Sequence, residues 1–310
     1  LWGSGRHRYG FELTIFRFGV QRPLRGGSAW DINNLYFAHY AISDIEKSRF
    51  RYFQRVGRAA LAYAGAKSGD ENAWIGSWRV RRHADSSHEV HAAGGEMELR
   101  LKLRPLKRPA IHGRDGVSRK GECRSCSSHY YSFTRLEARG TLRDSGSDVA
   151  VKGVAWSDHE WSSSKLERGV VGWDWFSMQL SDKVDIMLYR LRRADGTSVP
   201  QSSGTLDESD GTTRHLALSD FSVAALGRWQ SPRSAAAYPS GWRIRLPRYG
   251  ALLEVKPLIL DQELATQRST GTDYWEGACE IAGTFRGHRV SGVGYTELTG
   301  YAKAASNGLR

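Results

Sequence analysis

Apolar and polar residues alternate along most of this chain, as half-buried β-strands require. Side chains two residues apart lie on the same face of a strand, so such a segment has one buried and one solvent-facing side. Turn sequences such as DSGSD and RADGT separate the alternating segments. A weak helical period occurs over residues 48–64, where we expect a helix. The alternating segments are FELTIFRF (11–18), GEMELRLKLR (95–104), DVAVKGVAW (148–156), DWFSMQL (174–180), KVDIMLYRLR (183–192), GWRIRLP (241–247) and ALLEVKPLIL (251–260).

The chain also resembles itself. The segment GTLRDSGSDVAVKGVAWSDHE (140–160) aligns with GTFRGHRVSGVGYTE (283–297), and residues 2–17 align without a gap onto 175–190. Because both matches occur in the same order, they indicate two copies of one β unit. We therefore predict an all-β, mostly antiparallel fold with few short helices, in two domains over residues 1–170 and 171–310. Each is long enough for a closed or nearly closed barrel, which can enclose one small ligand.

The charge balance is basic, with a net charge of +12 over 310 residues and 25% charged residues. The arginines and lysines are scattered in ones and twos, and no nucleic-acid recognition motif accompanies them. We therefore expect no nucleic-acid partner, although a basic surface permits peripheral contact with anionic lipid. No run of 18 apolar residues is present. The first residues, LWGSGRHRYG, contain no apolar stretch of the kind that a signal peptide needs.

The cysteines do not indicate a metal centre. Cys123 and Cys126 form one C-x-x-C pair in a Gly/Ser/Arg-rich stretch, and Cys279 stands alone. A structural zinc site needs four ligands, and only His129 is near. We expect either two incidental thiols or one local disulfide, and no metal.

One stretch, VAWSDHEWSSSKLERGVVGWDWFSMQL (154–180), interleaves ionisable groups with tryptophans. Strand alternation places Trp156, Asp158 and Glu160 on one face, and Ser157, His159 and Trp161 on the other. In the next strand, Asp174 shares the apolar face of Phe176, Met178 and Leu180. We therefore expect Asp174 to be a buried carboxylate, and burial would raise its pKa.

The motifs AWSDHEW, GWDWFSMQL and IMLYRLRRADGT resemble the lipocalin-like family that includes carotenoid 1,2-hydratases (hydroxyneurosporene synthase-like proteins) and AttH-like secreted proteins. YGFELTIFRF, YFAHYAISD and YWEGACEIAGT extend the resemblance over essentially the whole chain. The resemblance implies two tandem lipocalin-like barrels, a lipophilic ligand, and a periplasmic or secreted location. It also implies an activity, the addition of water across an isoprenoid C=C bond. Ser157 stands where many relatives carry Met.

Two functions fit these residues. In the first, the protein is a cofactor-independent hydratase or lyase in which Asp158 or Asp174 donates a proton and His159 assists. In the second, it is a non-catalytic carrier of a hydrophobic small molecule, in which the charges of DHEW (158–161) are structural and the aromatic side chains line the cavity. Asp174 could be either an acid or a hydrogen-bonded structural carboxylate. No nucleophile elbow, phosphate loop or dinucleotide fingerprint is present, so we expect no cofactor. The ligand-binding residues that we predict are Trp156, Glu160, Trp161, Trp173, Trp175, Tyr131, His39, Trp275 and Tyr295.

Overall fold

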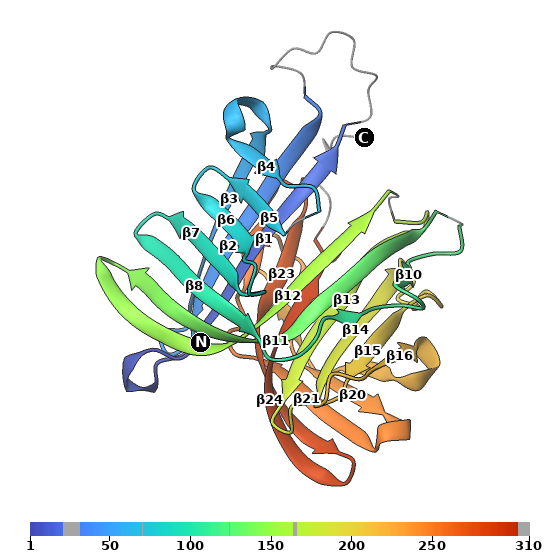
Figure 1. Cartoon of the computed structure of the whole chain (residues 1–310). Coiled ribbons are helices and arrows are strands. Elements are labelled where there is room, and N and C mark those ends of the chain that lie inside the picture. Colours follow the sequence, from blue (N-terminus) through green and yellow to red (C-terminus); the bar gives the residue numbers. More distant parts are fainter. Residues whose placement is uncertain (21–31, 70, 124, 164–165, 303–310) are drawn as a thin grey trace. The chain divides into compact units, whose positions relative to one another are not determined.

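The computed structural model describes residues 1–20, 32–69, 71–123, 125–163 and 166–302, and nearly all of its regular structure is β (Figure 1). Helical structure in these residues is limited to four three-residue 3-10 turns, η1 (Ser4–Arg6), η2 (Ala60–Ala62), η3 (Leu218–Asp220) and η4 (Pro247–Tyr249). None of the described helices is long and apolar enough to cross a membrane. The all-β fold expected from the alternation is confirmed.

The chain divides into two compact units. Unit 1 comprises Leu1–Pro105, Glu137–Ala155 and Thr266–Gly271, and unit 2 comprises Leu106–Leu136, Trp156–Ala265 and Thr272–Arg310. The division therefore falls within the hairpin strands β11 (Ser127–Asp144) and β12 (Ser147–Ser162), not at residue 170. Each of these long strands contributes one part to each unit.

Unit 1 contains a three-stranded antiparallel sheet and a larger one. The first has the order β1-β2-β3, and the second runs β11-β8-β7-β6-β5-β4 with β12 on β11. Tyr40 and Trp78, both buried, meet edge to face with ring centroids 5.7 Å apart. The strands are β1 (Tyr9–Gly19), β2 (Asn34–Asp44), β3 (Arg49–Arg58), β4 (Ala64–Ala66), β5 (Asn72–Ile75), β6 (Trp78–Arg82), β7 (His88–Gly94) and β8 (Met97–Pro105).

The prediction of a helix over residues 48–64 is wrong. Residues Arg49–Arg58 form β3, which pairs with β2 from Leu35↔Arg58 to Asp44↔Arg49. Aromatic and β-branched side chains at Phe50, Tyr52 and Val56 favour a strand, and the ladder to β2 overrides the weak helical period. Of the described residues after β3, only Ala60–Ala62 are helical before β4.

Unit 2 is built on one ten-stranded sheet, in the order β16-β15-β14-β13-β24-β23-β21-β20-β17, with β22 on β23. Side chains from strands far apart in this order, such as Leu206, Trp242 and Phe176, belong to one buried cluster. The sheet must therefore curl around that cluster, as Figure 1 shows. Its strands are β13 (Val170–Leu180), β14 (Asp185–Arg193), β15 (Ser203–Asp207), β16 (Thr213–Ala217), β17 (Ser222–Ala225), β20 (Trp242–Leu246), β21 (Ala251–Pro257), β22 (Glu263–Ala265), β23 (Asp273–Phe285) and β24 (His288–Leu298).

Shorter strands complete unit 2. Ala110–Ile111 (β9) and Val117–Arg119 (β10) both pair with the first part of β11. A separate ribbon joins β18 (Arg228–Gln230) to β19 (Ala237–Pro239). The C-x-x-C pair that follows β10 is a Cys123–Cys126 disulfide, one of the two alternatives expected, and Cys279 is buried and free.

The two alignable segments have matching strand neighbours. In unit 1, β12 follows β11 and bridges Trp2 through Lys152, while β11 adjoins β8. In unit 2, β24 follows β23 and pairs with β13, the strand of Trp175, while β23 adjoins β21. A Cβ on Gly140 or Gly283 would lie about 2 Å from a carbonyl oxygen of the adjoining strand, so both positions need glycine. These parallels support the internal duplication, which stays a prediction.

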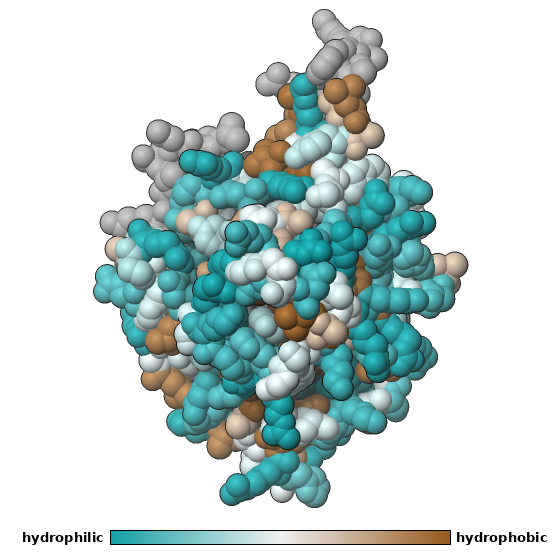
Figure 2. All heavy atoms as spheres, turned by 90° about the vertical axis from the view of Figure 1, so that its left-hand side faces the viewer, coloured by the Kyte–Doolittle hydropathy of each residue, from teal (hydrophilic) through white to brown (hydrophobic). Residues whose placement is uncertain are grey.

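Exposed charge is spread over unit 1. Outward-facing arginines and lysines alternate with buried apolar residues along β6 and β8, for example at Arg79, Arg81, Arg100 and Lys102. Figure 2, which shows the left-hand side of Figure 1, is mainly hydrophilic, with hydrophobic residues in small groups. Glu98, also on β8, pairs with Arg100 and with Arg143 of β11. On this face, the basic residues form a solvated surface.

Candidate functional site

Asp158 lies at the centre of a hydrogen-bond cluster in unit 2. Its Oδ1 atom accepts from the Tyr130 hydroxyl at 2.9 Å, from the Trp156 indole N–H at 2.8 Å and, at shorter range, from the Ser132 hydroxyl. β11 supplies Tyr130 and Ser132, and β12 supplies Trp156 and Asp158. All of the donors that contact Asp158 in the described residues bind Oδ1, so Oδ2 remains available to a substrate or to water.

The cluster changes the acidity of Asp158. Crowding by protein atoms removes water from around the carboxylate, and this raises its pKa from the ordinary value to about 6, although the residue retains solvent-exposed surface. The donors Ser132, Trp156 and Tyr130 oppose this effect by stabilising the anion, while the negative charge of Glu160 adds to it. A group that is crowded yet solvent-reachable suits proton exchange, and a pKa near 6 makes both its acid and its base form accessible near neutral pH.

Aromatic side chains lie on the Oδ1 side of this carboxylate. The Trp175 indole N–H donates to the Tyr130 hydroxyl at 3.1 Å, and the Trp156 and Trp175 rings meet edge to face at 6.2 Å. Trp156, Trp173 and Trp175 pack against a buried cluster that contains Tyr130 and Tyr189. Burial and the charge of Asp158 raise the pKa of Tyr130 well above its usual value, so its phenol stays protonated as a donor.

A lysine and a glutamate lie beside this cluster. The Lys120 ammonium is 3.0 Å from Glu160 Oε1, 3.8 Å from the ring centroid of Tyr189 and 5.3 Å from that of Tyr130. Ser128 donates a short hydrogen bond to Glu160. The positive charge is therefore held over two phenol rings and paired with a carboxylate.

His159 lies on the opposite face of β12 from Asp158. Its ring stacks on Tyr131 at 5.2 Å and meets Trp161 edge to face at 5.3 Å. Trp161 is half exposed and also stacks with His129 at 5.4 Å. The face assignment made from the sequence is thus observed, and it separates His159, Trp161 and Tyr131 from the carboxylate that His159 was expected to assist.

Asp174 is buried on the apolar face, as its neighbours indicated, but two cations surround it. Arg190 Nη2 lies 2.5 Å from Oδ2, Arg192 Nε lies 2.8 Å from Oδ1, and the Tyr301 hydroxyl donates to Oδ1 at 2.8 Å. Arg190 stands directly opposite Asp174 in the β13–β14 ladder. Of the two roles expected for Asp174, a proton donor or a hydrogen-bonded structural carboxylate, these contacts favour the structural one. Among the described residues, Asp174 shares no hydrogen-bond partner with Asp158, and it has the contacts of a structural ion pair.

The remaining predicted residues occupy separate places. His39 is buried in unit 1, its Nε2 2.8 Å from Ser269 Oγ, and burial lowers its pKa to about 4. Trp275 is in the unit 2 core and donates to Leu260 O at 2.7 Å. Trp173 donates to Glu297 Oε2 at 3.0 Å, and the backbone of Tyr295 bonds Ser177. Of the predicted set, Trp156, Asp158 and Trp175 are brought together around Tyr130, with Glu160 alongside.

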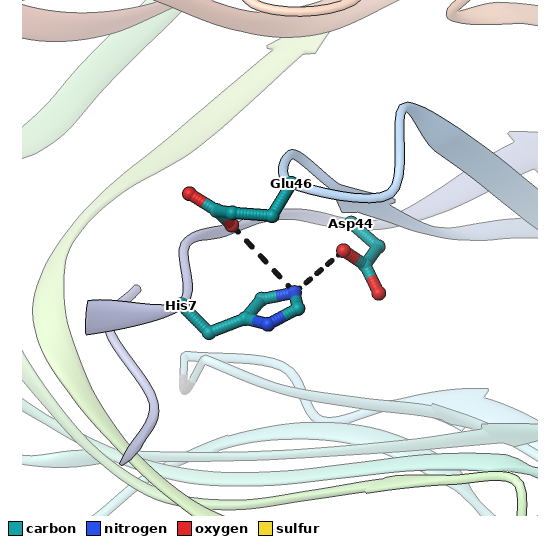
Figure 3. A group of neighbouring side chains, drawn as sticks. All are labelled: His7, Asp44 and Glu46. Atoms are coloured by element: carbon teal, nitrogen blue, oxygen red, sulfur yellow. Dashed lines mark hydrogen bonds and ion pairs between the residues drawn. The ribbon is translucent and has the colours of Figure 1, made fainter. Parts of the chain in front are cut away.

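One further group consists of side chains of the types that bind metal ions. His7, Asp44 and Glu46 in unit 1 present atoms within 4.8 Å of one another, with His7 Nε2 2.6 Å from Asp44 Oδ1 and 3.6 Å from Glu46 Oε2 (Figure 3). Arg8 already pairs with Glu46 at 3.1 Å and Lys47 with Asp44 at 3.4 Å. These cations form ion pairs with the carboxylates, so the group is explained as an ion-pair network.

Comparison with known proteins decides the family. The model of the AttH-like family matches residues 1–301. The chain belongs to the AttH-like family. This AttH-like protein is 31% identical to a protein assigned as AttH from Nitrosomonas europaea, whose crystal structure superposes with a TM-score of 0.85 over 97% of this chain and 89% of that one.

One further sequence relative and one further structural neighbour have been compared with this chain. Dehydratase asqC of Emericella nidulans is 19% identical over 273 residues, which cover 83% of this chain and 75% of that protein. The crystal structure of kievitone hydratase from Nectria haematococca superposes with a TM-score of 0.77 and 14% identity, over 97% of this chain and 86% of that one. The latter similarity establishes the shared fold.

Sequence reasoning missed Tyr130, Ser132, His112 and Lys120. Tyr130 and Ser132 were detectable in principle, because counting back along the hairpin from the DSGS turn places Ser132 or Phe133 opposite Asp158. His112 and Lys120 follow the short strands β9 and β10. No period or motif marks those two residues.

Proposed function

We propose that this protein is a hydro-lyase-type enzyme that adds water to, or removes it from, a lipophilic small molecule, with Asp158 as its acid–base group. The observation that carries the proposal is the carboxyl group of Asp158, which has three neutral donors on Oδ1, an available Oδ2 and a pKa of about 6. The named reactions of dehydratase asqC and kievitone hydratase agree with it.

The reaction balances with water as the only co-reactant. In the hydration direction, the proton on Asp158 Oδ2 adds to one carbon of a C=C bond, and the oxygen of water bonds to the other carbon. The excess proton of that water returns to Oδ2. In the reverse direction, Oδ2 protonates the departing hydroxyl group, the C–O bond breaks, and a proton from the adjacent carbon restores the acid. The three donors on Oδ1 stabilise the carboxylate that exists between these steps.

The substrate that we propose is isoprenoid-like, in keeping with the resemblance to carotenoid 1,2-hydratases. Protonation of such a molecule places positive charge on carbon, and indole faces stabilise a desolvated cation by about 2 kcal/mol. We assign this role to Trp156 and Trp175, which contact Asp158 and Tyr130 through their indole N–H groups. Trp161 projects from the other face of β12, so we assign it no part in the reaction.

The test compares Asp158→Asn with His159→Asn. Each protein is incubated with a panel of terpenoid alcohols and the corresponding alkenes in H2¹⁸O, and products are identified by mass spectrometry. We expect the wild type and His159→Asn to incorporate or release labelled water on at least one substrate, and Asp158→Asn to lose about 10²- to 10⁴-fold in rate. Equal rates for the Asp158→Asn and wild-type proteins would overturn the assignment of Asp158. A protein that retains a co-purified lipid unchanged, and turns over no panel member, would instead support the carrier function.

A further inference from the structure

A buried histidine contacts the far side of the Asp158 cluster. His112 Nε2 lies 2.6 Å from Ser132 Oγ, and His112 Nδ1 lies 2.8 Å from Thr205 Oγ1. The side chain is 1% exposed and its ring packs against Tyr130, with centroids 4.2 Å apart. Thr205, His112, Ser132 and Asp158 thus form one continuous chain of hydrogen bonds. The reaction proposed above does not use the first two of these residues.

The number of protons in this chain fixes its direction. The hydroxyl of Ser132 has one proton and donates it to Asp158 Oδ1, so Ser132 Oγ can only accept from His112. Burial, followed by the positive charges of Lys120 and His215, lowers the pKa of His112 to about 3, so its ring is neutral and has one N–H. That proton must be on Nε2, and Nδ1 must accept the hydroxyl proton of Thr205.

We propose that His112 is a positioning residue that keeps the Ser132 hydroxyl directed at Asp158 Oδ1 and thereby confines the exchangeable proton of Asp158 to Oδ2. If the His112 proton moved to Nδ1, Nε2 would accept from Ser132, and a lone pair of Ser132 would face Oδ1. The carboxyl group would then hold its proton on Oδ1, bonded to Ser132 and turned away from a substrate. The other titratable groups around the chain are Glu160, Tyr130, Lys120 and His215. The benefit of this hydrogen-bond chain depends on the proposed function, but the test of the chain does not.

The tautomer of His112 can be measured without any substrate. Protein labelled with ¹⁵N in its histidines is recorded by long-range ¹H–¹⁵N NMR between pH 5 and 8, and the His112 signals are assigned by their loss in His112→Gln. We expect the Nε2–H tautomer throughout this range, while Asp158 titrates. An Nδ1–H tautomer, or a change of tautomer that follows the titration of Asp158, would overturn the proposal.

A matched pair of variants measures the effect on Asp158. In His112→Gln the amide N–H can occupy the place of Nε2–H, whereas His112→Leu has no donor. The carboxyl stretch of Asp158 is followed by infrared difference spectroscopy against Asp158→Asn. We expect His112→Leu and Ser132→Ala each to raise the pKa of Asp158 by about one unit, and His112→Gln to change it much less.

A second comparison tests whether His112 acts through Ser132. The double variant His112→Leu/Ser132→Ala should match Ser132→Ala alone, since His112 acts through Ser132. If His112→Leu leaves the titration of Asp158 unchanged while Ser132→Ala shifts it, the positioning role is wrong. If His112→Leu does not fold, the tautomer of the wild-type protein decides the question. Failure of the proposed hydro-lyase activity would leave both measurements intact, because neither uses turnover.

Discussion

Two aspartates in unit 2, sixteen residues apart, differ in the charge of the groups that bind them. Asp174 contacts the guanidinium groups of Arg190 and Arg192 as well as a phenol, whereas every donor to Asp158 is neutral. Cations close to a carboxylate stabilise its charge far more than neutral donors do. The pKa of Asp158 is therefore raised despite three hydrogen bonds. Neutral donors thus leave the pKa of a crowded carboxylate free to rise, whereas neighbouring cations oppose such a rise.

The largest effect that we expect on stability comes from Asp174. Replacing it by Asn removes the negative charge that compensates Arg190 and Arg192, and breaking a buried pair in this way costs about 3–5 kcal/mol. The free energy of unfolding in urea measures this loss. Asp115→Asn, at an exposed position whose left-handed φ of 53° asparagine tolerates, is the control and should leave stability unchanged. A similar result for both variants would mean that the ion pair contributes nothing.

Replacing Asp158 by Asn should have the opposite effect on stability from replacing Asp174, and the size of this effect should depend on pH. The folded-state pKa of Asp158, about 6, lies above the value of about 3.9 for an unfolded chain, so the folded protein binds this proton more tightly. The contribution of Asp158 to stability is full below pH 4 and is lost as the pH rises to 6 and beyond. Asparagine does not titrate, so Asp158→Asn removes this loss of stability at high pH. We expect the melting temperature of the variant, relative to wild type, to be higher at pH 8 than at pH 4.

A constant difference in melting temperature across that pH range would show that Asp158 titrates normally. Asp174→Asn serves as the comparison, because it should remain less stable than wild type at pH 8.

Tyr130 should have a smaller effect. Tyr130→Phe removes one donor to Asp158 and the acceptor of the Trp175 indole N–H, without changing the ring that packs on His112. Loss of one hydrogen bond to a charged group makes the Asp158 carboxylate less stable relative to its protonated form, by a factor of roughly ten in the dissociation constant. We therefore expect the pH–rate profile to move toward higher pH by about one unit. An unchanged profile would exclude Tyr130 from the control of Asp158.

His159 should have the smallest effect. Its contacts are with Tyr131 and Trp161 on the exposed face of β12, so His159→Ala should change the free energy of unfolding by less than about 0.5 kcal/mol. Rates on any substrate that the wild type turns over should stay within about twofold. A loss of rate comparable to that of Asp158→Asn would show that the exposed aromatic face takes part in catalysis.

Most of the fold was predictable because the alternation of apolar and polar residues that marks a strand lies within the strand itself. Each of the seven alternating segments overlaps a strand of the structure, for example 11–18 with β1 and 251–260 with β21. The segment 48–64 was misread because β3 is only partly buried along its length, so its apolar positions carry no clear period of two. Membership of the AttH-like family agrees with the resemblance carried by AWSDHEW and GWDWFSMQL.

The site was predictable only in part, because it depends on pairing between strands. Alternation placed Trp156, Asp158 and Glu160 together on one face, but it could not show that Asp174 faces Arg190 across a ladder. That pairing depends on the register of β13 and β14, and the sequence offers many registers. His112 joins the cluster from a loop after a two-residue strand, where no periodic signal exists. Which of these residues are catalytic stays a prediction.

The passage of β11 and β12 through both units limits how this chain can be divided. A fragment that starts at residue 171 would lack Tyr130, Ser132 and Asp158, although most of its own sheet would be intact. A break between residues 170 and 171 would therefore separate the Asp158 cluster from Trp175 and Thr205, which accompany it in unit 2. If the two halves arose by duplication, residues from both now meet in one hydrogen-bonded cluster, and a break at residue 170 would leave that cluster incomplete on either side.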